Sequence, residues 1–462
     1  MAESLREAGF EGEHAPDGSI EAVTVDTRKG CTGALFVALQ GSRSDGHDFL
    51  EDAIAQGAAA LLVSQEHAGA AGEVSAGKPV FAVPDTLAAL QALAEAYRNR
   101  VNPRVVAVTG TTGKTETKDF IASILAERFT VHATPGNLNN HIGLPLTIFG
   151  MAGGEDVLVV EMGANHEKEI GRLSEIAKPE VGVITNIGPG HLEFFGSLEG
   201  VASAKAELLE SLPESGTAVL PADDEFFQFL SQRTKGRVVS FGFDEGSDWR
   251  IEDLTRDGRS GYLFSLKGVE IPLRRFGRHH VLNAAAAAAA CSLLGSSGGE
   301  IASGISGTKI PESRGVLYDI DGVLFIDDSY NSNPASLAAA VSALMEIETD
   351  GNRWLALGDM LELGERSLDL HRESGEVCGK AGVDGIVTLG TETVELSRSA
   401  AEQRRAPERI SHFIVTAKLA AYLNTCLMKG DIVLVKGSRG MRMEGVIETM
   451  EELRGVQRRR VD

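Results

Sequence analysis

The sequence predicts an α/β protein with three domains. Short apolar, β-branched segments alternate with helical patterns along the chain, which is typical of parallel sheets covered by helices. A strand pattern at residues 105–109 leads into the glycine loop Gly110–Thr115 and then into a helical pattern. This layout indicates a nucleotide-binding sheet. At 462 residues the chain is too long for one core, so several domains are expected.

The first domain is predicted at residues 1–102. It is expected to be a small α/β domain, because short strand patterns alternate there with alanine-rich helical stretches. Those strands are expected at 22–25, 34–39, 60–63 and 80–83. The segment Asn99–Pro103 combines polar residues with a proline, so it predicts a linker.

The central domain is predicted at residues 103–313 and the third at 314–462. Parallel strands of the central domain are expected at 105–109, 157–161, 181–187 and 217–220. Seven consecutive alanines at 284–290 predict a buried, closely packed helix, because alanine has the highest helix propensity. After Pro311 the α/β pattern starts again, with strands expected at 323–327, 354–357, 385–389 and 431–435.

Composition excludes several classes of protein. The net charge is −22, which argues against a nucleic-acid-binding protein, because such proteins carry surplus Lys and Arg. The four cysteines lie far apart without a CxxC pair, so neither a disulfide framework nor a zinc site is expected. No signal peptide and no membrane span are apparent. The sequence therefore predicts a cytoplasmic protein.

The loop Gly110–Thr115 is the strongest chemical signal. Its glycines allow backbone N–H groups to approach phosphate oxygens, Lys114 would reach the β- and γ-phosphates, and Thr115 would bind Mg²⁺. The general phosphate-loop pattern requires glycine at position 108, where this chain has Val108, and glycine-rich turns also occur without ligands. Because the loop stands between an apolar strand and a helical pattern, nucleotide binding is the favoured interpretation.

Polar residues at neighbouring strand ends predict a metal site. Glu161 ends the strand 157–161 beside the phosphate loop, where a carboxylate can hold Mg²⁺, although many such acids are simply solvated. His191 follows a Gly-Pro-Gly turn and is a candidate second ligand, although a lone histidine is usually structural. Lys205, considered by its chemistry alone, resembles an ordinary surface lysine.

Other polar segments are less specific. The turn Asn137–Asn140 is rich in amides, which suit hydroxyl-rich ligands such as sugars but also build structural turns, and the two interpretations are evenly balanced. In the third domain, Asp327 and Asp328 end a strand that Arg314 precedes. The turn 436–440 adds cationic side chains that could hold an anion.

Taken together, these segments resemble the Mur ligase family, the ATP-dependent amide-forming enzymes of bacterial peptidoglycan precursor synthesis. The family's phosphate loop is the short form Gly-x-x-Gly-Lys-Thr/Ser, which Gly110–Thr115 fits, so that Val108 is no departure. The resemblance covers essentially the whole chain. It is carried by residues 26–28, 45–47, 134–147, 161–166, 326–334, 357–364 and 435–444.

The resemblance implies a division of labour among the domains. The first would bind a UDP-sugar, the central P-loop domain would bind ATP, and the third, Rossmann-like domain would bring the incoming amine. The motifs are most similar to those of members that join D-alanyl-D-alanine to UDP-N-acetylmuramoyl-tripeptide, and a monomer is expected. Alternatives are a member that adds the third residue, a folylpolyglutamate synthase, and a nucleotide-switched binding protein without ligase chemistry.

The resemblance also implies residue roles in the ATP site. Residues expected to bind ATP are Gly110, Thr111, Thr112, Gly113, Lys114, Thr115, Glu116, Asn283 at the adenine, and Arg314 and Asp328 at the phosphates or ribose. Residues expected to bind two Mg²⁺ ions are Thr115, Glu161, His191 and Lys205, the last after carbamylation by CO₂. Lys114, His191 and Lys205 are the expected catalytic residues.

Substrate contacts are implied at both ends of the chain. Asp26, Thr27 and Arg28 resemble the uridine-nucleotide loop, and Asn139 and Asn140 fall in the substrate-facing turn. Candidates for the amine pocket, by position only, are Asp359, Ser438 and Arg439. Glu116 departs from the family, in which Thr or Ser often follows the loop. An acid in the first turn suits the helix dipole, so no loss of function is expected.

Overall fold

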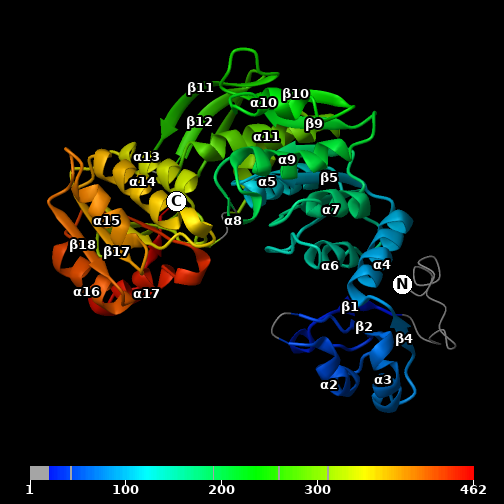
Figure 1. Cartoon of the computed structure of the whole chain (residues 1–462). Helices are drawn as coiled ribbons and strands as arrows, with labels where there is room; N and C mark the ends of the chain where they lie inside the picture. Colours follow the sequence, from blue (N-terminus) through cyan, green and yellow to red (C-terminus); the bar gives the residue numbers. More distant parts are fainter. Residues whose placement is uncertain (1–19, 42–43, 191, 259–260, 310–311, 462) are drawn as a thin grey trace.

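The structure is a computed structural model that describes residues 20–41, 44–190, 192–258, 261–309 and 312–461. Three sheets of four, nine and seven strands follow one another along the chain. In Figure 1 the nine-stranded sheet and its helices lie between the N-terminal sheet and the C-terminal sheet. The predicted α/β fold is therefore confirmed. The exact domain boundaries at 102 and 313 stay a prediction.

The first sheet is parallel throughout. Its order is β1 (Ala22–Thr24), β2 (Ala34–Val37), β3 (Ala60–Ser64) and β4 (Val80–Val83), so all four predicted strands are present. The sheet is accompanied by η1 (Thr27–Lys29), η2 (Gly46–Phe49), α2 (Leu50–Ala55), η3 (Gln65–His67) and α3 (Ala68–Val74).

The predicted linker at 99–103 is wrong, because the helix α4 (Thr86–Val101) continues through most of it. Asp85 caps the start of α4, and Asn102 ends it in the left-handed conformation. Arg98 is buried near that end and donates to the carbonyl of Ala177 at 2.8 Å. This contact with the central domain stabilises a last turn that the local sequence does not favour.

The central sheet has the order β13-β12-β11-β10-β9-β8-β5-β7-β6. Its strands are β5 (Arg104–Thr109), β6 (Val131–Ala133), β7 (Val157–Glu161), β8 (Val181–Ile184), β9 (Thr217–Pro221), β10 (Arg237–Gly242), β11 (Trp249–Asp257), β12 (Gly261–Leu266) and β13 (Val269–Leu273). Pairing is parallel from β6 to β11, as predicted, but β12 and β13 add an antiparallel edge. The strand predicted to reach residue 187 ends at Ile184.

Helices cover both faces of the central sheet. They are α5 (Lys114–Ala126), α6 (Gly143–Phe149), α7 (Glu169–Ala177), α8 (Leu192–Phe195), α9 (Leu198–Glu210), α10 (Phe227–Ser231), α11 (His279–Leu293) and α12 (Gly298–Gly307). On β5, Val106 and Val108 join the core with α5 and α11, whereas Val105 and Ala107 join the core on the opposite face. All seven alanines of 284–290 are completely buried within α11, which confirms the predicted helix.

The third sheet has the order β18-β17-β16-β19-β15-β14-β20. Its strands are β14 (Val316–Ile320), β15 (Val323–Asp328), β16 (Arg353–Gly358), β17 (Gly385–Leu389), β18 (Arg409–Phe413), β19 (Ile432–Lys436) and β20 (Arg459–Arg460). Its helices are α13 (Pro334–Met345), η4 (Gly364–Arg366), α14 (Ser367–Lys380), α15 (Thr393–Ala401), α16 (Thr416–Cys426), η5 (Arg439–Met441) and α17 (Glu444–Arg454). The parallel strands reverse their order between β16 and β19, as in doubly wound sheets.

The third domain contacts the central one at several points. Tyr262 in β12 donates a hydrogen bond to Glu346, which follows α13, at 2.7 Å, and α8 packs against η4. Within the part of the chain that the structure describes, no helix is long and apolar enough to cross a membrane.

Candidate nucleotide-binding active site

The register of the central sheet brings three loops together. β5 lies between β7 and β8, with Val108 opposite Glu161 and Thr109 opposite Ile184. The chain therefore leaves all three strands at the same edge of the sheet. Ligands of open α/β sheets bind at this carboxyl edge. The predicted proximity of the phosphate loop and Glu161 is thus built into the strand pairing.

The phosphate loop is held open by the loop that follows β8. The backbone N–H of Thr112 donates to the side chain of Asn186 at 3.1 Å, and Thr185 Oγ1 donates to the carbonyl of Thr112 at 2.5 Å. Gly110 and Gly113 both have positive φ, and a Cβ at either would overlap a neighbour, Thr185 or Asn283 respectively. Both positions therefore require glycine. Sequence reasoning missed Thr185 and Asn186, since they look like an ordinary strand end.

Lys114 begins α5 and lies within its own loop. Its Nζ donates to the carbonyls of Gly110 at 3.0 Å and Thr111 at 3.1 Å. Burial lowers the pKa of Lys114, while the negative charge of Glu161 acts in the opposite direction. The Nζ group thus lies at the loop where phosphate oxygens would lie, and its hydrogen-bond partners among the described residues are carbonyl oxygens that a phosphate can outcompete.

Glu161 is a buried carboxylate with one oxygen unsatisfied. It is 2% exposed, and Asn139 donates to its Oε1 at 2.7 Å. Its Oε2 is buried and finds no hydrogen-bond partner among the described residues. Such an orphaned oxygen is costly unless a cation or a donor occupies the space beside it. The carboxylate therefore fits the predicted role of a metal ligand.

The two asparagines predicted to face substrate have structural contacts. Asn139 positions Glu161, as described above. Asn140 accepts hydrogen bonds from the backbone N–H groups of Ile142 and Gly143 through its Oδ1, at 3.2 and 2.8 Å, at the start of α6. Asn139 thus supports the expected metal ligand, and Asn140 shapes the turn.

Lys205 is a buried residue, which its sequence context did not indicate. It lies in α9 and is 4% exposed. Burial, with an additional contribution from the charge of Lys114, lowers the pKa of Lys205 to about 7. A lysine amine with such a pKa is largely neutral above pH 7 and is a competent nucleophile. The other predicted catalytic residue of this region, His191, lies outside the described residues.

Glu116 lies in the first turn of α5, where it also makes buried contacts with distant residues. It is buried and contacts His280 Nδ1 and Asn283 Nδ2, the latter at 2.7 Å, while Arg275 Nε lies 3.4 Å from its Oε1. Burial alone would raise the pKa of the Glu116 carboxyl, but His280 and Arg275 together lower it to about 2. Glu116 therefore connects the phosphate loop to the start of α11.

A cavity of about 160 Å³ adjoins the phosphate loop on this side. It is lined by Thr112, Thr185, Asn186, Pro221, Asp223, Asp224, His279, Leu282 and Asn283. Burial lowers the pKa of His279 to about 3, so this imidazole is neutral at physiological pH. The cavity begins at the loop and contains the predicted adenine contact Asn283, so a bound nucleotide would have room for its base here.

The third domain places an arginine on the phosphate loop. Arg314 Nη2 donates to Thr115 Oγ1 at 3.3 Å, and its guanidinium lies 3.8 Å from the centroid of the Tyr330 ring. Asp328 Oδ2 accepts from Lys436 Nζ at 2.6 Å. The structure thus brings Arg314 to the loop as predicted, and it reveals Lys436, which is 3% exposed, as the partner of Asp328.

The three candidates for an amine pocket differ in whether their side chains are free of buried hydrogen bonds and could therefore contact a ligand. Asp359 accepts from the backbone N–H groups of Thr391, Glu392 and Thr393 at 2.8, 3.1 and 2.8 Å. Ser438 accepts from the N–H of Leu361 at 2.8 Å and is buried. Arg439 has a side chain that is 62% exposed and pairs with Glu444 at 3.2 Å. Only Arg439 is placed to meet a ligand without breaking buried contacts.

Replacement of Asp359 by alanine is therefore expected to lower stability. Three backbone donors would lose a buried charged acceptor, which costs on the order of 2 kcal/mol in the free energy of unfolding. Urea denaturation measures the change. The matched control is Asp369→Ala, an exposed acid of α14, for which a change below about 0.5 kcal/mol is expected. Unchanged stability with weaker dipeptide binding would instead assign Asp359 to the substrate.

The motif at residues 26–28 lies on the N-terminal domain. Asp26 Oδ2 and Arg28 Nη2 form an ion pair at 2.8 Å, and Thr27 begins η1. The preceding strand β1 packs against α6, which starts just after the Asn139–Asn140 turn. The side chain of Arg28 is 88% exposed, so an anionic ligand could approach its guanidinium group beside Asp26.

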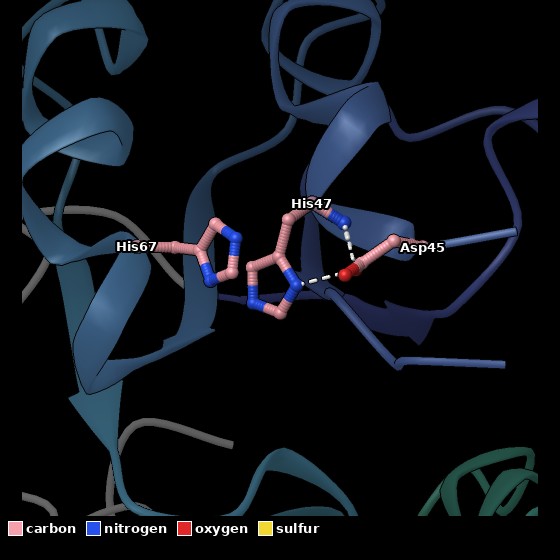
Figure 2. A group of neighbouring side chains, drawn as sticks. All are labelled: Asp45, His47 and His67. Atoms are coloured by element: carbon pink, nitrogen blue, oxygen red, sulfur yellow. Dashed lines mark hydrogen bonds and ion pairs between the residues drawn. The ribbon is translucent and has the colours of Figure 1, made fainter.

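A second polar cluster, Asp45, His47 and His67, is shown in Figure 2. His47 Nδ1 lies 2.6 Å from Asp45 Oδ1, its Nε2 accepts from the backbone N–H of Ser64 at 3.0 Å, and its ring stacks on His67. Both ring nitrogens of His47 are therefore occupied by hydrogen bonds. The spacing would suit a cation, but the bonds show that the motif at 45–47 ties its loop to the end of β3.

Known proteins are similar to this chain in sequence and in fold. The family models for the Mur ligase catalytic domain, middle domain and glutamate ligase domain match residues 19–98, 108–291 and 314–439. UDP-N-acetylmuramoyl-tripeptide–D-alanyl-D-alanine ligase of Bacillus subtilis is 38% identical over 94% of this chain and 93% of its own length.

Solved structures agree with these matches. MurF from Acinetobacter baumannii superimposes with a TM-score of 0.88 at 30% identity, covering 98% of each chain. MurF ligase from Thermotoga maritima in complex with ADP has a TM-score of 0.83 at 30% identity, covering 94% of this chain and 98% of that one. With the phosphate loop and the three sheets described above, these likenesses show that the chain belongs to the Mur ligase family.

Proposed function

We propose that this protein is an ATP-dependent ligase that joins D-alanyl-D-alanine to UDP-N-acetylmuramoyl-tripeptide. One observation carries the proposal: the phosphate loop, an unsatisfied buried carboxylate at Glu161 and an arginine of the third domain converge at one sheet edge. The chain that carries this arrangement is similar, over nearly its whole length, to UDP-N-acetylmuramoyl-tripeptide–D-alanyl-D-alanine ligases.

Amide formation requires activation of the tripeptide carboxylate. A carboxylate oxygen attacks the γ-phosphorus of ATP, the bond to the β-phosphate breaks, and an acyl phosphate and ADP result. The amine of the dipeptide then attacks the acyl carbon, inorganic phosphate leaves, and the amine loses a proton. Lys114, released from its loop carbonyls, would neutralise charge on the transferring phosphoryl group, and Arg314 approaches the same loop from the third domain.

Thr115, Glu161, His191 and a carbamylated Lys205 would hold two Mg²⁺ ions. The donor set fits, because Glu161 Oε2 has no partner within the described ranges and oxygen donors suit this ion. Bound Mg²⁺ would offset the charge of the phosphates. Carbamylation would replace the amine of Lys205 with an anionic ligand, and the pKa of about 7 supports it, because CO₂ reacts only with the neutral amine.

The remaining roles follow the domain plan of 1–102, 103–313 and 314–462. Asp26, Thr27 and Arg28 would hold the uridine nucleotide, Asn283 the adenine, Asp328 the ribose or phosphates, and Arg439 the incoming dipeptide. Asn139, Asn140, Asp359 and Ser438 would shape these sites through the hydrogen bonds described above. We propose a cytoplasmic monomer.

An ADP-release assay tests the proposal. Release is expected only when ATP, UDP-N-acetylmuramoyl-tripeptide and D-alanyl-D-alanine are all present, and the product should be the pentapeptide. A panel of tripeptides ending in lysine or diaminopimelate identifies the preferred acceptor, and single amino acids and a folate test the alternative ligases. Release driven by one of those instead of the dipeptide would reject the proposal, as would nucleotide binding without any turnover.

A further inference from the structure

Glu116 occupies an unusual position for a carboxylate. It directly follows Lys114 and Thr115 in the first turn of α5, yet it is directed away from the phosphate position and toward α11. Its Oε2 contacts both His280 Nδ1 and Asn283 Nδ2, and these partners lie 164 and 167 residues away in the sequence. A residue that suited only the helix dipole would need neither contact.

The carboxylate fixes which end of the Asn283 amide faces it. Its Oε1 faces the guanidinium of Arg275, and an ionised carboxylate only accepts hydrogen bonds. The amide atom 2.7 Å from Oε2 must therefore be the NH₂ group of Asn283. The carbonyl Oδ1 then takes the other terminal position of the amide, and a Cβ built on Gly113 of the phosphate loop would overlap it.

The carboxylate is itself held in place. Arg275 is 3% exposed, and its Nη2 donates to the carbonyls of Thr308 and Lys309 at 2.9 and 3.0 Å. His280 is 8% exposed and contacts the same carboxylate oxygen that Asn283 does. Because Arg275 is itself buried and anchored, Glu116 cannot rotate away without leaving its own charge and that of Arg275 unpaired.

Asn283 therefore presents one fixed pattern to the cavity beside the loop. Within the described part of the chain, no donor reaches its Oδ1, and Asn283 lines the 160 Å³ cavity. An amide carbonyl oxygen that has no donor can accept from the 6-amino group of adenine, and the second amide hydrogen can donate to N7. A 6-oxopurine such as guanine or hypoxanthine would instead place a carbonyl oxygen against Oδ1.

We infer that Glu116 is a positioning residue that selects adenine over 6-oxopurines by fixing the amide of Asn283. The inference rests on the proposed function, since it assumes that the cavity receives the base of the nucleotide substrate. Without Glu116, the amide of Asn283 could turn over and present NH₂ to a 6-oxo group. The two classes of base would then bind with similar affinity.

Binding of fluorescently labelled ADP and inosine diphosphate (IDP) to the full chain tests this inference. The wild-type protein is expected to prefer ADP by about 10- to 100-fold, the range of one well-placed amide–base pair. In Glu116→Ala the ratio should fall to about threefold or less. Glu116→Thr introduces the residue that is common at this position in the family. It provides the same binding test if the alanine variant does not fold. The KM of the threonine variant for ATP should also rise above the wild-type value.

Ile305→Val is the matched control, because Ile305 is buried in α12, which packs on α5, and Ile305 is not among the polar partners of Glu116 described above. Its loss of stability should leave the base ratio unchanged. A wild-type ratio near one, or an unchanged ratio in a folded Glu116 variant, would overturn the inference. The binding assay needs no ligase substrate, so failure of the proposed function would appear separately, as absent ADP release by the wild-type protein.

Discussion

Replacement of Lys114 by alanine is expected to reduce ATP turnover roughly a thousandfold, in line with the loss of a preorganised cation at a transferring phosphoryl group. The Nζ of Lys114 lies at the phosphate loop, and among the described residues it donates to the carbonyls of Gly110 and Thr111. Within the described ranges Lys114 belongs to no ion pair, so the fold of the variant should persist. Single-turnover ADP release with both substrates measures the loss, and the melting temperature should stay within a few degrees.

The charge-matched control for this variant is Lys380→Ala. Lys380 lies in α14, its side chain is 60% exposed, and it pairs with Glu376 at 2.8 Å. A surface pair of this kind contributes little, so turnover should be unchanged. A Lys114→Ala protein with wild-type turnover would mean that the glycine loop is structural, and the proposed function would then fail.

Much of the fold could be predicted because its strands carry local signals. β7 and β19 are apolar runs buried on both faces, and such runs are visible without any tertiary information. β11 was missed because many of its residues are exposed and polar, as expected at an antiparallel edge. The prediction ended the helix α4 too early, at residue 98. Its last turn depends on a tertiary contact, because Arg98 donates to the carbonyl of Ala177, and the local sequence does not show that contact.

The residues of the candidate site likewise fall into two groups: those that local sequence places, and those whose partners are distant in the sequence. The position of Glu161 follows from its place at a strand end, which sequence shows. Its partner Asn139 lies 22 residues away, and Asp359 binds backbone donors more than 30 residues away. The contact of Glu116 with His280 joins residues 164 positions apart. No local pattern encodes such pairs, because they depend on how whole elements pack.

Replacement of Lys205 by arginine is expected to reduce activity strongly although the positive charge is kept. Arginine stays protonated and cannot take up CO₂, so no anionic ligand would form at the metal site. A drop of roughly a thousandfold is expected, comparable to the loss of a main electrostatic contact. Carbon-13 NMR of protein equilibrated with labelled CO₂ should show a carbamate signal in the wild type that is absent from the variant.

If Lys205 is carbamylated, activity should decrease as the pH falls. Burial lowers the pKa of Lys205 to about 7, so the amine is protonated below that value and neutral above it. Uptake of CO₂ should therefore weaken as the pH falls from 8 to 6, and added bicarbonate should partly restore activity at the lower pH. If Lys205 acted as an ammonium ion, acidification would leave its role intact and Lys205→Arg would remain active. The arginine variant and the bicarbonate response therefore distinguish an anionic metal ligand from a cation that neutralises phosphate.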